Sequence, residues 1–143
     1  YLIDISSLAS STLLNLTDGR YYLVYTNNNF QVSDNYDGGN LRGVNTLSGG
    51  ETFLVSLSLA LALSQTICAK SFKTIEFFFL DEGFGTLDSN LLDVVMNALE
   101  KLKSSRFTIG VISHVEELKH RIESKIIVKK ATETHGSSVN IGL

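Results

Sequence analysis

The sequence has 143 residues, 43% of them hydrophobic, which is enough for one globular domain that buries most of its apolar surface. The net charge is −3. Residues 1–100 hold 4 Lys and Arg against 11 Asp and Glu, whereas residues 101–143 hold 8 against 4. This mild excess of basic residues in the last part of the chain is typical of a solvated face rather than of a nucleic-acid-binding protein. The sequence contains no transmembrane run of about 18 apolar residues, no signal-peptide pattern and only one cysteine, so we expect neither membrane insertion nor secretion but a reducing cytoplasm.

The first third of the chain predicts a helix followed by a β-hairpin. Residues 2–16 carry leucine and isoleucine at a loose helical spacing, and the turn signal TDG follows. Two aromatic and β-branched runs, residues 21–26 and 30–33, are joined by three asparagines and lead into a polar loop, residues 34–45. Because the helical pattern is already under way at Tyr1 and no methionine begins it, we expect a fragment of a longer polypeptide.

The rest of the chain alternates helices and strands. Apolar strands separated by helices predict an α/β fold with a mainly parallel sheet that is covered on both faces. We expect Cys68, in the first of these helices, to behave as a small buried hydrophobe. The predicted elements are a helix over 52–69, a strand over 75–80, a helix over 89–103, a strand over 107–112, a helix over 116–122, and strands over 125–130 and 138–141.

Two adjacent carboxylates, Asp81 and Glu82, follow the apolar strand FFFL. Open α/β sheets bind their ligands at this end of the strands. There Asp81 would hold a hydrated Mg²⁺, and Glu82 would orient and polarise the water that attacks a γ-phosphate. Taken alone, the pattern is also that of an ordinary acidic turn after a core strand.

The segment LSGGE, at positions 47–51, lies directly before a long helix. Ser48 supplies a hydroxyl, and Gly49 and Gly50 supply backbone N–H groups without side chains, an arrangement that suits an anion at a helix N-terminus. The simpler interpretation is a capping box, with Ser48 as the N-cap and Glu51 three residues later. Both interpretations can hold together, but capping alone does not explain the paired glycines.

Two further strand ends carry polar residues. His114 follows the strand over 107–112, so a parallel sheet would bring it to the same edge as Asp81 and Glu82, where it could donate to a γ-phosphate. A single histidine at a strand end is more often structural, and the three histidines show no zinc-site spacing. Asp88 ends the turn GFGTLD and is predicted to cap the helix that follows.

In chain order, LSGGE, FFFLDE, GFGTLD and ISH resemble the signature motif, Walker B motif, D-loop and switch histidine of ATP-binding-cassette (ABC) ATPases. The longer segments TLSGGETFLVSLSLALALS, FLDEGFGTLD and TIGVISHVEELKHRI resemble the SbcC family of DNA-repair ATPases almost continuously. The resemblance implies the C-terminal lobe of an ABC-type P-loop ATPase head. Residues 1–16 would be the end of a coiled-coil helix that enters the head, and residues 17–143 the lobe itself.

The resemblance also implies a role for each motif. Ser48, Gly49, Gly50 and Glu51 would contact ATP bound to the opposite head of a homodimer. In their own head, Asp81 would serve Mg²⁺, and Glu82 and His114 would act in catalysis. Asp88 would lie at the dimer seam. The loop over 130–138 departs from the family pattern and receives no role.

No G-x-x-x-x-G-K-[ST] phosphate loop occurs in the sequence. In the family that this chain resembles, the loop lies in an N-terminal Walker A lobe. We therefore expect the isolated chain to be half an active site, without ATPase activity until the lobe joins it. The implied partners are this lobe, a second head, an SbcD-type nuclease and, through the complex, DNA.

Two other functions fit parts of the pattern. A transporter nucleotide-binding domain shares the motifs, but it more often has a proline in the turn where this chain reads GFGT, and a more charged signature helix. A non-catalytic SMC-like interaction domain would tolerate loss of the key residues, whereas Ser48, Glu82 and His114 are all present.

Overall fold

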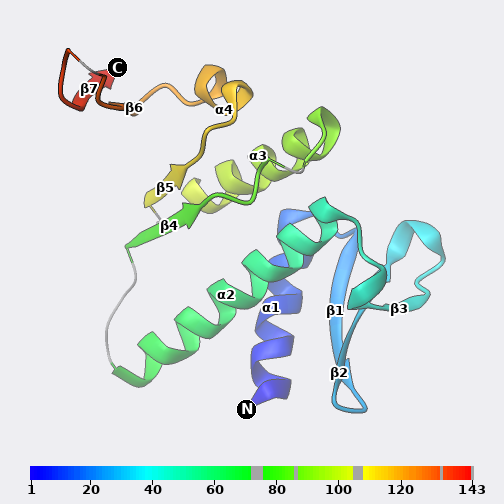
Figure 1. The fold of residues 1–143 in the computed structure, drawn as a ribbon. Coiled ribbons are helices and arrows are strands. Elements are labelled where there is room, and N and C mark those ends of the chain that lie inside the picture. The colour runs from blue at the N-terminus through cyan, green and yellow to red at the C-terminus, as the bar shows by residue number, and fades with distance from the viewer. Residues whose placement is uncertain (72–75, 86, 105–107, 133, 143) are drawn as a thin grey trace. The chain divides into compact units, whose positions relative to one another are not determined.

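The computed structural model describes residues 1–71, 76–85, 87–104, 108–132 and 134–142, and it contains two compact units (Figure 1). Unit 1 spans Tyr1–Ile112 and unit 2 spans Ser113–Leu143. The elements of unit 1 are α1 (Leu2–Leu16), β1 (Tyr21–Thr26), β2 (Asn29–Asp34), η1 (Asn35–Asp37), β3 (Leu41–Gly43), η2 (Val44–Thr46), α2 (Gly49–Ser71), β4 (Phe77–Asp81), α3 (Ser89–Ser104) and β5 (Thr108–Ile112).

The predicted β-hairpin is confirmed, and a third strand joins it. Asn27 and Asn28 both have positive φ, 50° and 58°, which is the backbone of the two-residue type I′ turn that matches strand twist. β1, β2 and β3 form an antiparallel sheet in that order. β3 lies inside the predicted polar loop, and its three residues, LRG, are too few to show an alternating pattern.

Helices α1, α2 and α3 form the core of unit 1 together with the three-stranded sheet, and α1 packs against both α2 and β1 (Figure 1). α1 ends at Leu16, as predicted, where Thr17 and a left-handed Asp18 turn the chain toward β1. The helix positions that α1 and α2 bury recur every three or four residues, as an amphipathic packing face requires. They include Ile5, Ala9, Leu13 and Leu16 of α1 and Leu54, Leu57, Leu61 and Ala62 of α2.

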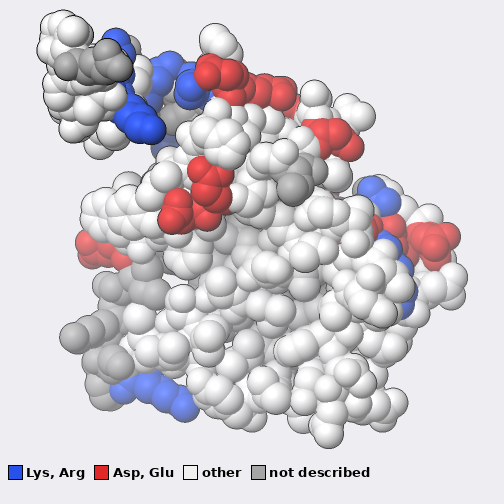
Figure 2. Space-filling model, in the orientation of Figure 1, with Lys and Arg blue, Asp and Glu red and all other residues white. Residues whose placement is uncertain are grey.

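α2 is apolar beyond this buried face. By length and composition, Gly49–Lys70 is the one helix in the described part of the chain that could cross a membrane, but the core helix of a soluble protein passes the same test, and 33% of its most apolar stretch is buried here. Leu63 and Ile67 are exposed, and Cys68 is half-buried rather than buried as predicted. Few charged side chains lie over α1, α2 and the hairpin on the face shown in Figure 2. α2 therefore presents apolar surface that the described residues leave exposed.

The predicted parallel pairing is confirmed for β4 and β5, which α3 connects in the chain. Residues 75 and 107, which belong to the predicted strands, lie outside the described residues. The described helices leave Phe77 and Phe79 of β4 61% and 66% exposed. Their rings are 6.5 Å apart, and Phe79 lies over Gly110, where a Cβ atom would be 2.5 Å from its ring.

Unit 2 contains the short helix α4 (Glu116–Arg121) and an antiparallel hairpin of β6 (Lys125–Lys129) and β7 (Ser138–Gly142), close to the predicted bounds. Ile126 pairs with Ile141, and Val128 pairs with Val139. These four side chains are 64–78% exposed. Both units thus expose β-branched or aromatic strand residues that usually pack in an interior.

Candidate functional site

The start of α2 forms the predicted capping box. The backbone N–H of Ser48 donates to Glu51 Oε2 at 2.7 Å, and the N–H of Glu51 donates to Ser48 Oγ at 3.4 Å. The carbonyl of Ser48 accepts from Thr52, which closes the first turn. Ser48 and Gly49 are exposed, so the start of this helix is open to a ligand. Helix geometry leaves the first N–H groups without partners inside the helix.

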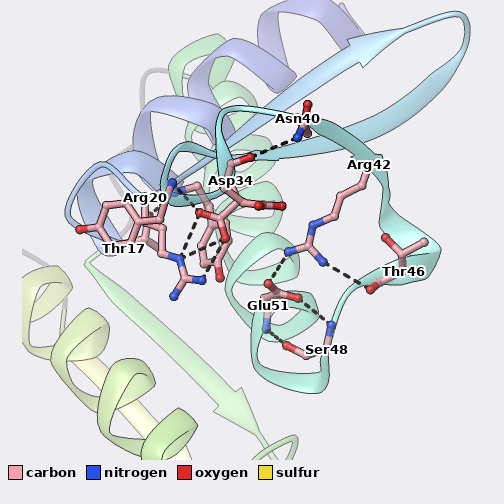
Figure 3. A network of polar contacts seen from close by, with 11 residues as sticks. Thr17, Arg20, Asp34, Asn40, Arg42, Thr46, Ser48 and Glu51 are labelled. Atoms are coloured by element: carbon pink, nitrogen blue, oxygen red, sulfur yellow. Dashed lines mark hydrogen bonds and ion pairs between the residues drawn. The ribbon is translucent and has the colours of Figure 1, made fainter.

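Arg42 of β3, which was not predicted from the sequence, forms an ion pair with Glu51 of α2 (Figure 3). Burial alone would raise the pKa of the Glu51 carboxyl, but the hydrogen bonds from Arg42 and from the Ser48 N–H outweigh it, and the pKa is lowered. Nearby, burial and, second, the interaction with Glu51 raise the pKa of Tyr21 to about 12. Glu51 is therefore a carboxylate at neutral pH. No local sequence signal links residues 42 and 51, because the pair depends on the path of β3.

A second ion pair, between Arg20 and Asp34, was also not predicted from the sequence. Arg20 donates to both carboxylate oxygens of Asp34, at 2.9 and 3.2 Å, and the N–H of Tyr36 donates to Oδ1 (Figure 3). The hydrogen bond from Arg20 leads the causes that lower the pKa of the buried Asp34 carboxyl. Bidentate geometry of this kind fixes orientation as well as charge. Arg20 thus ties the end of α1 to β2.

Gly50 has a packing role that the sequence did not show. It is buried, and a Cβ atom at this position would be 2.7 Å from the Leu91 side chain of α3. One of the paired glycines is therefore explained by the close approach of α3 to the start of α2. Gly49 is exposed and remains the better candidate for a backbone contact with an anion.

The carboxylates lie where the sequence predicted, at the end of β4. Asp81 is the last residue of the strand, and both Asp81 and Glu82 are exposed. The N–H of Glu82 donates to the carbonyl oxygen of Ile112 at 2.9 Å, so a hydrogen bond to β5 holds the backbone of Glu82 in place. Glu82 has φ of +61°, a left-handed conformation that costs a residue with a Cβ about 1–2 kcal/mol. Strain of this kind is concentrated at functional sites, where the surrounding structure maintains it.

The turn after Glu82 packs against the start of α2. Phe84 is 1% exposed, its ring lies 5.1 Å from that of Phe53, and Phe53 also lies beside Gly83. Phe53 lies two residues beyond the LSGGE segment. Packing within unit 1 therefore joins the signature-like segment to the turn that carries the carboxylates.

The predicted helix cap at Asp88 is confirmed. Its Oδ1 accepts from the N–H of Leu91 at 2.9 Å, and its carbonyl accepts from Leu92. Because Leu91 lies against Gly50, the starts of α2 and α3 come together at one end of unit 1. Thr86, in the turn before Asp88, lies outside the described residues.

His114 belongs to unit 2, so its expected place beside Asp81 and Glu82 stays a prediction. The backbone pairing needed for it is present, since Asp81 is in register with Ile112 at the end of β5. In the described ranges, no group of three or more His, Cys, Asp or Glu residues could hold a metal ion. Mg²⁺ suits this edge, because it is commonly held by one or two carboxylates together with substrate phosphates.

Comparisons with known proteins indicate the family of the chain. A family model described as SbcC/RAD50-like, Walker B motif, matches residues 15–101. The SbcC subunit of the SbcCD nuclease from Clostridium acetobutylicum is 50% identical over 135 residues, and that from Bacillus subtilis is 52% identical over 136 residues. Each match covers 94% of this chain but only 12% of the relative, so the chain spans a small part of these proteins.

Solved structures show the fold. The SMC head domain from Thermotoga maritima aligns with a TM-score of 0.69 at 20% identity, over 96% of this chain and 47% of that chain. A structure from work on ATP-driven dimerization and DNA-stimulated activation of SMC ATPases aligns with a TM-score of 0.67 at 22% identity, over 96% and 83%. The α/β fold is therefore that of part of an SMC-type head.

Proposed function

The chain belongs to the SbcC/RAD50-like family, and on this basis we propose that it is the C-terminal half of an ATP-hydrolysing head. The observation that carries the proposal is the packing of Phe84 on Phe53, which joins the LSGGE helix start to the Asp81–Glu82 turn in one unit. ATP-driven dimerisation of two such heads would control the access of a partner nuclease, of the SbcD type, to DNA. The complex would act in the cytoplasm.

Asp81 and Glu82 would divide the chemistry between them. Asp81, at the end of the strand, would hold Mg²⁺, and the bound ion would neutralise charge on the β- and γ-phosphates. Glu82 would accept a proton from the attacking water. The left-handed backbone of Glu82 supports these two roles. Because the chain leaves the strand conformation at this residue, the side chains of Asp81 and Glu82 need not point to opposite faces of the sheet, as successive strand residues do. His114 would donate to the γ-phosphate.

The start of α2 would serve the other head of the dimer. The Ser48 hydroxyl and the N–H group of Gly49 are exposed at a helix N-terminus, where the macrodipole favours the phosphates of ATP bound to the opposite head. Gly50 and Glu51 would complete this segment, and Asp88 would lie at the seam between the heads. The ATP-driven dimerization described for the SMC ATPase of similar fold offers a precedent for such an arrangement.

The exposed strand residues support the proposal that a second lobe packs against this chain. Phe77 and Phe79 of unit 1, and Ile126 and Val128 of unit 2, present apolar side chains to solvent. Burying such surface is worth about 25 cal/mol per Å², so a partner that covers it would be bound strongly. We assign this role to the N-terminal lobe of the same protein, which would bring the Walker A phosphate loop; "joined head" below means the two lobes assembled.

ATP should convert the joined head from monomer to dimer. Light scattering coupled to size-exclusion chromatography would measure the mass with Mg²⁺ and a non-hydrolysable ATP analogue. We expect the mass to double with the analogue and to stay that of one head with ADP, because only a γ-phosphate would reach the α2 start of the second head. An unchanged mass in the presence of saturating analogue would rule out ATP-driven dimerisation.

A further inference from the structure

The carboxylate of Glu51 poses an electrostatic problem for the proposed function. It lies at the helix N-terminus that would receive the phosphates of a second head, and its side chain is only 14% exposed. A carboxylate there neutralises part of the positive end of the helix and repels an approaching phosphate. The helix start can accept ATP only if this negative charge is balanced.

Arg42 supplies the balance. Its guanidinium donates through Nη2 to Glu51 Oε1, while the other oxygen of Glu51 accepts from the Ser48 N–H (Figure 3). Each of the two carboxylate oxygens therefore accepts a hydrogen bond from the protein. The Arg42 side chain is 33% exposed, so part of its positive charge still faces solvent.

Arg42 also fixes the path of the chain into the helix. Its Nη1 donates to the carbonyl of Thr46 at 3.4 Å, and its backbone is in register with Val32 of β2. The residue therefore connects the three-stranded sheet, the segment before Ser48 and the first turn of α2. A lysine in the same place would keep the charge but would lack the fork that reaches two acceptors.

We propose that Arg42 is a positioning residue for the ATP-dependent contact between heads: it neutralises Glu51 and orients it, so that Ser48 and Gly49 can receive the phosphates of the opposite head. The inference rests on the proposed function and adds a residue outside the LSGGE segment to it. Arg42 itself would act through Glu51, and its replacement should leave nucleotide binding in its own head intact.

The test measures the dissociation constant of the dimer of joined heads by analytical ultracentrifugation, with Mg²⁺ and a non-hydrolysable ATP analogue. Arg42→Ala should weaken the dimer about tenfold or more, and Arg42→Lys should fall between Arg42→Ala and the wild type. Binding of a fluorescent ATP analogue to monomeric heads should change less than twofold. Arg20→Ala is the matched control, since it removes an arginine paired with the carboxylate of Asp34 in the same sheet but leaves the Arg42–Glu51 ion pair in place.

A double variant separates charge compensation from a merely structural role. Gln can replace Glu in a capping box but carries no charge. In the Arg42→Ala background, Glu51→Gln should therefore restore most of the lost dimer affinity, whereas a structural role predicts no recovery. A wild-type dimer constant in Arg42→Ala, or a double variant as weak as the single one, would overturn the inference while the proposed function stands. A wild-type head that fails to dimerise would overturn both.

Discussion

Replacing Glu82 by Gln in the joined head is expected to lower ATP hydrolysis by about 10²-fold or more, on the scale of general acid–base catalysis. Gln keeps the size and the hydrogen-bonding reach of the side chain but cannot take a proton from water. ATP binding should survive, since Glu82 would act on the water and not on the nucleotide. Because hydrolysis would open the dimer, the variant should accumulate as an ATP-bound dimer.

The neighbouring carboxylate predicts the opposite outcome. Asp81→Asn should weaken binding of Mg²⁺-ATP, because it removes the charge at the end of β4 that would hold the ion. Fewer dimers should form. Size-exclusion chromatography with ATP and Mg²⁺, together with phosphate release, would compare the two variants. Glu76→Gln is the matched control, since Glu76 is exposed just before the other end of the same strand.

Either of two results would contradict the assignment of Glu82 as the base. One is hydrolysis at the wild-type rate by Glu82→Gln. The other is a Glu82→Gln head that stays monomeric with ATP while the wild type dimerises.

Ser48→Arg is expected to abolish ATP-induced dimerisation of the joined head. The substitution places a long cationic side chain at a helix start where a phosphate and the facing head must approach closely. It also removes the hydroxyl that accepts from the N–H of Glu51. The nucleotide pocket of the variant's own head should stay intact, so ATP binding and dimerisation should separate.

Nucleotide titration and light scattering on the joined head would test this separation. Ser56→Arg is the matched control, because Ser56 is exposed about two turns further along α2. We expect the control to dimerise with ATP and Ser48→Arg to remain monomeric at the same nucleotide occupancy. A Ser48→Arg dimer of normal stability would remove Ser48 from the contact between heads.

Local interactions explain what the sequence could predict. The capping box of Ser48 and Glu51 and the cap at Asp88 join residues three positions apart, so their spacing alone determines them. The asparagine turn of the hairpin is equally local. The position of Asp81 follows from the sequence because an apolar run ends at it.

Features that depend on non-local interactions could not be predicted from the sequence. The Arg42–Glu51 pair depends on how β3 joins the sheet, and the need for Gly50 depends on where α3 brings Leu91. The strand FFFL reads as buried because its composition suits an interior, yet this chain leaves Phe77 and Phe79 exposed. A hydrophobic pattern indicates that a surface becomes covered and does not indicate which segment covers it.

We propose that this chain holds half of an ATPase site. The most direct measurement is Mg²⁺-dependent phosphate release by the chain alone, by the separately purified N-terminal lobe, and by the two mixed. We predict background rates for each part and a restored rate for the mixture, because the groups that bind the β- and γ-phosphates would come from the added lobe. Hydrolysis by this chain alone at the rate of the joined head would contradict the claim.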